Sequence, residues 1–214
     1  MPESNDAFKR ERQRTKFIFN CAAFIYPLIE KNLFPQYRET LVELNLPVHL
    51  TVMDWASGTG ILAAAFYERG HQVKGIDFSE RLIRRARKKY AEISFELKDL
   101  FCLDPNEEPS CDIVCMGYLL HGLSPGLREI ILDKAARMAN HYVLIFDHGL
   151  AGNWLVEWIE RLEGSYYKEF IASDKKLAFA RAGLIIKTDF STSDYGHVWL
   201  CEKLSGKDVN NDEV

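Results

Sequence analysis

The chain has 214 residues, of which 47% are hydrophobic and 27% charged, and its formal net charge is −4. This composition is typical of a folded domain and excludes long disorder, while the acidic balance disfavours a nucleic-acid partner. No run of about 18 apolar residues occurs, so we expect no membrane span and a cytoplasmic protein. The five cysteines lack zinc-like spacing with histidines, which favours free thiols and predicts no metal site.

Residues 1–47 are predicted to form an N-terminal helical extension. The apolar spacing over 8–30 is that of an amphipathic helix, which Pro27 is expected to kink or end. A second helical segment is expected over 37–44, and Asn45 and Pro47 then end it.

From residue 48 onward, strand and helix patterns alternate along the chain. Ser124 followed by Pro125 is typical of a helix start, with a capping hydroxyl before a proline in the first turn. Strands are expected at 49–55, 72–77, 93–98, 112–117, 141–146, 184–189 and 197–204, and helices at 60–69, 79–91, 125–139, 154–162 and 175–181. This order predicts an α/β fold with a doubly wound, seven-stranded, mostly parallel sheet, whose last strand returns antiparallel in a hairpin. One structural domain is expected, followed by a polar tail at 205–214.

A glycine-containing loop follows the first strand, and ligands bind beyond the carboxyl ends of strands in such sheets. The second strand ends in Asp77, whose carboxylate can accept hydrogen bonds from both ribose hydroxyls of a nucleoside. These features suit either a dinucleotide or S-adenosylmethionine. The third glycine of the dinucleotide fingerprint is missing here. This is weak evidence against a dinucleotide, because alanine is tolerated at that position. Asp54 at the start of the loop argues more strongly, because it would repel a pyrophosphate but suits a ligand with an ammonium group.

The segment VMDWASGTG at 52–60 resembles motif I of the class I S-adenosylmethionine-dependent methyltransferases, commonly written VLDLGCGTG. VKGIDF at 73–78 resembles their motif II, and FELKDL at 95–100, DIVCMGYLL at 112–120 and the segment 142–147 resemble later parts of the domain. The resemblance covers 48–204 and implies a Rossmann-like methyltransferase fold, with S-adenosyl-L-methionine as cofactor and S-adenosyl-L-homocysteine as product. Ala56 stands where the family has its first glycine, and a methyl group there is compatible with the loop if Ala56 keeps a negative φ.

The resemblance also implies a cofactor site. Asp54 and the loop backbone would hold the methionine moiety, Asp77 the ribose and Asp99 the adenine amino group. Phe78 would pack beside the adenine, and Tyr118 would border the sulfonium. The implied set is Asp54, Ala56, Ser57, Gly58, Gly60, Asp77, Phe78, Asp99, Leu100, Gly117 and Tyr118.

The methyl acceptor is expected beyond the fourth and fifth strands. His121 and His148 are candidate catalytic bases there, although a histidine that caps a loop is at least as plausible for each. The candidate substrate pocket comprises Tyr26, His121, His148, Trp154 and Tyr166, with core packing as the alternative for the tryptophan. The fourth strand is followed by GYLLHG and lacks the motif of amide or adenine amino-group methylation, so a small-molecule acceptor is expected. A monomer or homodimer is expected.

Two other functions are compatible with the same sequence. One is a catalytically weak methyltransferase-like subunit that binds or stabilises a partner, which the alanine at position 56 leaves open. The other is an NAD(P)-dependent oxidoreductase, which Asp54 disfavours.

Overall fold

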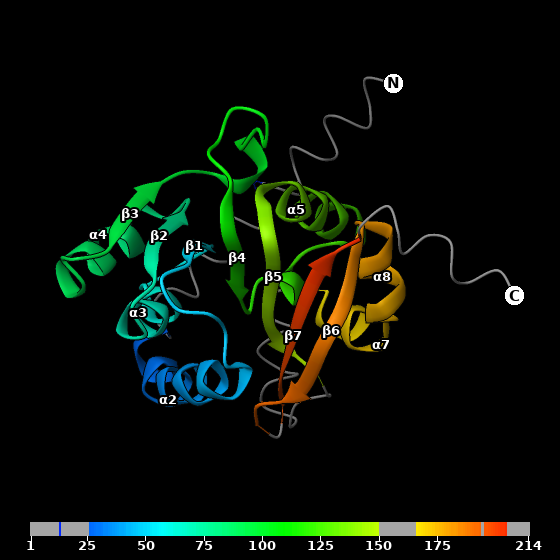
Figure 1. Cartoon of the computed structure of the whole chain (residues 1–214), viewed down its shortest axis with the longest axis horizontal. Helices are drawn as coiled ribbons and strands as arrows, with labels where there is room; N and C mark the ends of the chain where they lie inside the picture. The colour runs from blue at the N-terminus through cyan, green and yellow to red at the C-terminus, as the bar shows by residue number, and fades with distance from the viewer. Residues whose placement is uncertain (1–12, 14–25, 150–165, 194, 205–214) are drawn as a thin grey trace, which may run out of the picture.

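A computed structural model of the chain describes residues 13, 26–149, 166–193 and 195–204. They contain one seven-stranded sheet with the strand order β3-β2-β1-β4-β5-β7-β6 (Figure 1). The strands are β1 (Thr51–Trp55), β2 (Gln72–Asp77), β3 (Ser94–Leu97), β4 (Cys111–Gly117), β5 (Ala139–His148), β6 (Leu184–Ser191) and β7 (Gly196–Lys203). The pairs among β1 to β5 are parallel, and β7 is antiparallel to both β5 and β6. The predicted fold class is therefore confirmed.

Helices cover both faces of the sheet. They are α2 (Tyr26–Leu44), α3 (Ile61–Glu68), α4 (Glu80–Lys89), α5 (Pro125–Met138), α7 (Tyr167–Ala172) and α8 (Lys175–Arg181), with short 3-10 turns η1 (Leu100–Cys102) and η2 (Leu120–Gly122). Val52 of β1 packs in the core beside α2 and α3, whereas Met53 and Trp55 pack in the core beside α5 and α8. Successive strand residues point to opposite faces, and burial on both faces explains the continuous apolar runs in the central strands β1, β4 and β5.

The helical extension differs from the prediction in one respect. Helix α2 is continuous from Tyr26 to Leu44 and includes Pro35, so the expected separation into two segments is wrong within the described residues. Tyr37 and Leu41 of this helix are 4% and 1% exposed and pack on the sheet. This burial outweighs the hydrogen bond that a proline removes from a helix interior. The predicted helical residues 8–12 and 14–25, the helix at 154–162 and the tail at 205–214 lie outside the described residues.

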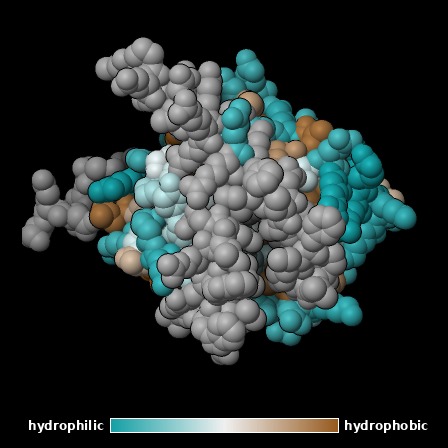
Figure 2. Space-filling view, turned by 180° about the vertical axis from the view of Figure 1, so that it is seen from behind, coloured by the Kyte–Doolittle hydropathy of each residue, from teal (hydrophilic) through white to brown (hydrophobic). Residues whose placement is uncertain are grey.

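The surface of the described part is mainly polar. The face shown in Figure 2 is largely hydrophilic where residues are coloured, with separate hydrophobic spots. Isolated apolar side chains of this kind are normal on a protein surface. None of the described helices combines the length and the apolar character that a bilayer span requires.

Candidate functional site

The loop between β1 and α3 is bound tightly to β2. Ser57 N donates to Ile76 O at 2.9 Å, and Gly60 N donates to Ser57 O at 2.8 Å. Gly60 has φ 84°, and a Cβ at this position would lie 2.6 Å from the ring carbon Cζ of Phe95. Only glycine fits there, because the residue needs both a left-handed backbone and close contact with an aromatic ring.

Ala56 has φ 53°, so the negative φ under which an alanine was expected to be compatible with the loop is not adopted. The loop takes the left-handed conformation that the family's glycine would adopt freely. In an alanine this conformation costs about 1 kcal/mol of steric energy. Tyr118, immediately after β4, also has φ 53°. Both residues line the same cavity. Strained backbone of this kind concentrates at functional sites.

This cavity lies beyond the carboxyl ends of β1, β2 and β4. The strand order reverses between β1 and β4, which is where open α/β sheets bind their ligands. Most of the lining comes from residues that the sequence predicts for the cofactor site. The lining residues are Ala56, Gly58, Asp77, Phe78, Leu82, Gly117, Tyr118 and Leu119.

Asp77 presents a nearly buried carboxylate to this cavity. Its Oδ2 accepts from Gly58 N at 2.9 Å, and its Oδ1 accepts from Ser79 N at 2.7 Å. Burial raises the pKa of Asp77 to about 6, although the two backbone N–H groups act against this rise. The group is therefore mainly ionised at neutral pH, and each oxygen keeps a lone pair for a further donor.

Asp54 lies beneath the loop and not among the cavity-lining residues. Its Oδ2 accepts from Ala63 N at 3.0 Å, and the residue is 1% exposed. Burial raises the pKa of Asp54 to about 8, so the carboxyl group is mostly protonated at neutral pH. The structure thus gives Asp54 a role in joining β1 to the first turn of α3, and a contact with a ligand ammonium group stays a prediction.

The other predicted cofactor residues are not among those that line the cavity. Asp99 accepts from Phe101 N at 3.0 Å and caps η1, and Leu100 is buried. The hydroxyl oxygen of Ser57 is buried and has no hydrogen-bond partner among the described residues.

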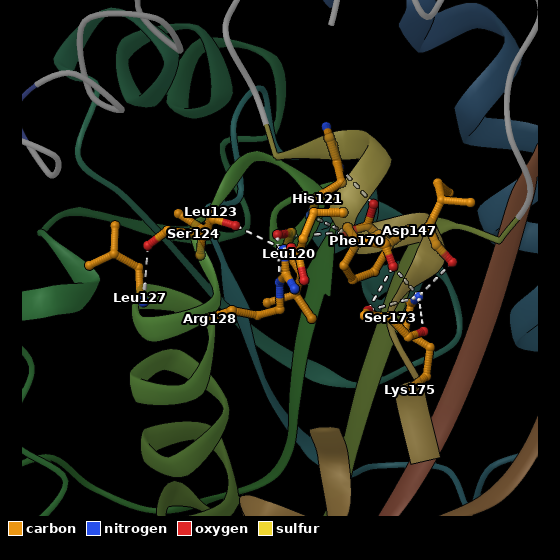
Figure 3. A network of polar contacts seen from close by, with 12 residues as sticks. Leu120, His121, Leu123, Ser124, Leu127, Arg128, Asp147, Phe170, Ser173 and Lys175 are labelled. Atoms are coloured by element: carbon orange, nitrogen blue, oxygen red, sulfur yellow. Dashed lines mark hydrogen bonds and ion pairs between the residues drawn. The ribbon is translucent and has the colours of Figure 1, made fainter. Parts of the chain in front are cut away.

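A second group of polar residues meets at the ends of β4 and β5. Asp147 is fully buried, and its Oδ2 accepts from Leu120 N at 2.8 Å and from His121 N at 3.2 Å. Its Oδ1 lies 2.7 Å from His121 Nδ1 (Figure 3). The same oxygen accepts from His148 N at 2.8 Å. Burial alone would raise the pKa of Asp147, but the adjacent His121, with a further contribution from His148, holds this pKa below its usual value. Asp147 is thus a carboxylate, and His121 donates to it through Nδ1–H.

His121, Asp147 and His148 place three potential metal-ligand atoms within 4.8 Å of one another. The sequence analysis predicts no metal site. The short distances among these three residues do not by themselves show that they bind an ion. The hydrogen bonds of Asp147 show whether it suits ligating an ion or orienting His121. Asp147 already accepts four of them, which uses the lone-pair sites of a carboxylate. We therefore assign Asp147 to orienting His121 and not to ligating an ion.

His148 lies in a group of rings that we call the aromatic cluster: Tyr118, His121, His148 and Tyr167. The His148 ring centroid is 4.7 Å from that of His121, 5.1 Å from Tyr118 and 4.9 Å from Tyr167. Burial, with a smaller contribution from His121, lowers the pKa of His148 to about 4, so its imidazole is neutral at pH 7. Its Nδ1 is buried without a hydrogen-bond partner in the described part of the chain. Tyr118 also lines the cavity, so the cluster adjoins it.

A family model described as a methyltransferase domain matches residues 52–141. Residues 52–141 are a methyltransferase domain. The match begins in β1 and reaches the start of β5, so it contains the loop and every residue that lines the cavity. No curated protein matches the sequence.

Solved methyltransferases share the fold over most of the chain. A magnesium protoporphyrin IX methyltransferase from Synechocystis with bound S-adenosylhomocysteine has a TM-score of 0.62 at 19% identity, covering 80% of this chain and 82% of that one. An O-methyltransferase family 2 protein from Planctomyces limnophilus in complex with apigenin has a TM-score of 0.65 at 18% identity, covering 86% and 61%. A TehB-like methyltransferase from Corynebacterium glutamicum has a TM-score of 0.60 at 18% identity, covering 86% and 99%. At this identity the likeness shows the fold alone.

The methyltransferase domain and β5 bring His121 and His148 together, as the predicted acceptor site requires. Tyr166 caps α7 and is half-buried, whereas the adjacent Tyr167 is 2% exposed and contacts both histidines. Trp154 and the side chain of Tyr26 lie outside the described residues.

The prediction of the site omits Asp147 and selects Tyr166 from the tyrosine pair. One signal for Asp147 was present, because an acidic residue ends an otherwise apolar buried strand just as Asp77 does.

Proposed function

We propose that this chain transfers a methyl group from S-adenosylmethionine to a small-molecule acceptor. The observation that carries the proposal is the cavity at the ends of β1, β2 and β4, with the Asp77 carboxylate at one side and Tyr118 of the aromatic cluster at another. The similar structures include a magnesium protoporphyrin IX methyltransferase and an O-methyltransferase in complex with apigenin, which supports a small acceptor.

The residues present fit a nucleoside with an amino-acid tail. A Cβ built on Gly58 meets only the carbonyl oxygen of Ala56, at 4.0 Å, so the loop backbone is open to a ligand there. Asp77 has two lone pairs available for ribose hydroxyls, and Phe78 offers a ring for the adenine. Gly117 and Tyr118 would border the sulfonium, next to the aromatic cluster. When bound, S-adenosylmethionine supplies an activated methyl group for in-line displacement.

The chain's own contribution is alignment, exclusion of water and proton acceptance. Asp147 orients the His121 ring through Nδ1–H, so Nε2 is the nitrogen that can accept a proton when the ring is neutral. We assign to Nε2 the removal of the proton from an acceptor hydroxyl or amine, following the logic of an Asp-oriented histidine base. His148 is neutral at pH 7 and already has a low pKa, so it suits binding of the acceptor better than proton removal.

Calorimetric titration with S-adenosylhomocysteine and, separately, with NADH tests this function. We expect binding of S-adenosylhomocysteine and none of NADH. Binding of NADH alone would make the chain an oxidoreductase. Absence of both heats would overturn the proposal and favour a partner-binding subunit that has lost its cofactor.

A further inference from the structure

Arg128, on the first turns of α5, is a buried arginine that the proposed mechanism does not use. Its side chain is 5% exposed. A buried guanidinium is costly unless its donors are matched to acceptors. The identity of those acceptors therefore indicates what the residue holds in place.

One set of acceptors lies on the turn that carries His121. Arg128 Nε donates to Leu120 O at 3.1 Å, and its Nη2 donates to Leu123 O at 2.9 Å (Figure 3). These carbonyls flank His121 on both sides in the chain. Within the turn, Leu123 N donates to Leu120 O at 3.1 Å, and Arg128 Nε is a second donor to the same oxygen. Arg128 thus fixes the turn from the side chain of a different helix.

The other contacts lie on α7. Arg128 Nη2 also donates to Glu169 Oε2 at 2.9 Å, and its Cζ lies 4.8 Å from the ring centroid of Phe170, which is fully buried. Tyr167, at the start of the same helix, contacts His121 and His148. One guanidinium therefore joins the two segments that contribute His121 and Tyr167 to the aromatic cluster.

A second cation, Lys175, binds the carboxyl end of α7. Lys175 Nζ donates to Ser173 O at 3.0 Å and to the carbonyl oxygen of Phe170, and it lies 4.3 Å from the Phe170 ring centroid. The hydrogen bonds of Lys175 in the described structure go to Phe170, Ile171 and Ser173, and none of them reaches η2. Arg128 thus links α7 to η2 by hydrogen bonds, beside the ring contact of Tyr167 with His121.

We propose that Arg128 is the positioning residue of the acceptor site, where it holds the η2 turn in register with α7 so that His121 keeps its hydrogen bond to Asp147. The inference rests on the proposed function, in which His121 removes the acceptor proton. Reaction rates depend steeply on such placement, and a shift of about 1 Å can cost about 100-fold. Lysine cannot replace the fork, because an ammonium group lacks the planar set of donors that reaches both carbonyls and Glu169 together.

The experiment observes His121 directly and needs no acceptor. In protein with nitrogen-labelled histidine, the Nδ1–H of His121 gives a far-downfield proton signal, assigned by its loss in His121→Gln. In Arg128→Met we expect this proton to exchange with water about tenfold faster or more, which corresponds to loss of a charge-assisted hydrogen bond. Arg128→Lys should be intermediate. Arg137→Met, an exposed arginine of the same helix, should behave as the wild type.

An unchanged exchange rate in folded Arg128→Met would overturn the inference, even if the variant were less stable. If Arg128→Met does not fold, Arg128→Lys decides: faster exchange supports the role, and wild-type exchange contradicts it. S-adenosylhomocysteine affinity should be unchanged in Arg128→Lys and Arg137→Met, because neither residue lines the cavity. Failure of the wild type to bind S-adenosylhomocysteine would instead overturn the proposed function, and the exchange result would still be interpretable.

Discussion

The Asp77 carboxylate is the residue-scale feature with the clearest consequence for a ligand. Replacing Asp77 with Ala should weaken binding of S-adenosylhomocysteine by about 1.5–3 kcal/mol, since ribose hydroxyls lose a charged acceptor. Asp77→Asn should be intermediate, because an amide oxygen keeps one acceptor. Affinity should also fall as the pH drops below about 6, where this carboxyl group becomes protonated.

Calorimetry of the two Asp77 variants checks this prediction. Asp133→Ala is the matched control, because Asp133 is an exposed aspartate on α5, remote from the lining residues. Equal affinities for the wild type and Asp77→Ala would remove Asp77 from the site.

Ala56 provides a second prediction at the same scale. Ala56→Gly should raise the free energy of unfolding by up to about 1 kcal/mol, because glycine adopts a positive φ without the steric cost that alanine pays. The greater entropy of glycine in the unfolded chain reduces this gain. Urea denaturation measures it. A clear loss of stability would show that the alanine methyl group contributes packing that outweighs its strained backbone.

At the scale of elements, Asp54 joins the end of β1 to the first turn of α3. Its pKa is about 8 in the folded protein against an ordinary value of 3.8, so between these values the folded state binds more protons than the unfolded state. Stability from this group is therefore lost as the pH rises. Asp54→Asn lacks this titrating proton, so its free energy of unfolding should fall less than that of the wild type between pH 6.5 and 8. The difference between the two proteins should be up to about 1.4 kcal/mol per pH unit.

Urea denaturation of both proteins at the two pH values gives the comparison. Other titrating groups are common to both proteins and cancel in the difference. Parallel pH dependence in the wild type and Asp54→Asn would show that Asp54 is ionised throughout this range.

The elements show how far sequence patterns reach. The central strands β1, β4 and β5 could be predicted because each contains an apolar run buried on both faces, and the capped start of α5 is visible in Ser124 and Pro125. The continuity of α2 through Pro35 could not be predicted from the sequence, because it depends on the burial of Tyr37 and Leu41 against the sheet. Helix propensity carries no information about that packing.

The candidate site divides in the same way. Asp77 and Gly58 could be predicted because they follow one another within a single strand–loop–strand unit. The pairing of His121 with Asp147 joins residues 26 apart and depends on the parallel register that places Gly117 beside Phe146. The backbone conformation of Ala56 depends on the contact of Ser57 N with β2. Both are consequences of tertiary structure.

At the scale of the whole molecule, the two halves of the sheet contribute different parts of the proposed site. The matched methyltransferase domain, residues 52–141, supplies the loop, Asp77 and His121. Asp147 and His148 at the end of β5, together with Tyr167 of α7, come from the remainder of the chain. In Figure 1 the strand β4 of the first part lies beside β5 at the middle of the sheet, and the cavity and the aromatic cluster adjoin there through Tyr118.

A crystal structure with S-adenosylhomocysteine tests this arrangement most directly. The account predicts that the ribose hydroxyls donate to the Asp77 carboxylate, that the adenine packs beside Phe78, and that the sulfur lies at Gly117 and Tyr118, facing the aromatic cluster. Density for the ligand anywhere else, or with its ribose away from Asp77, would contradict it.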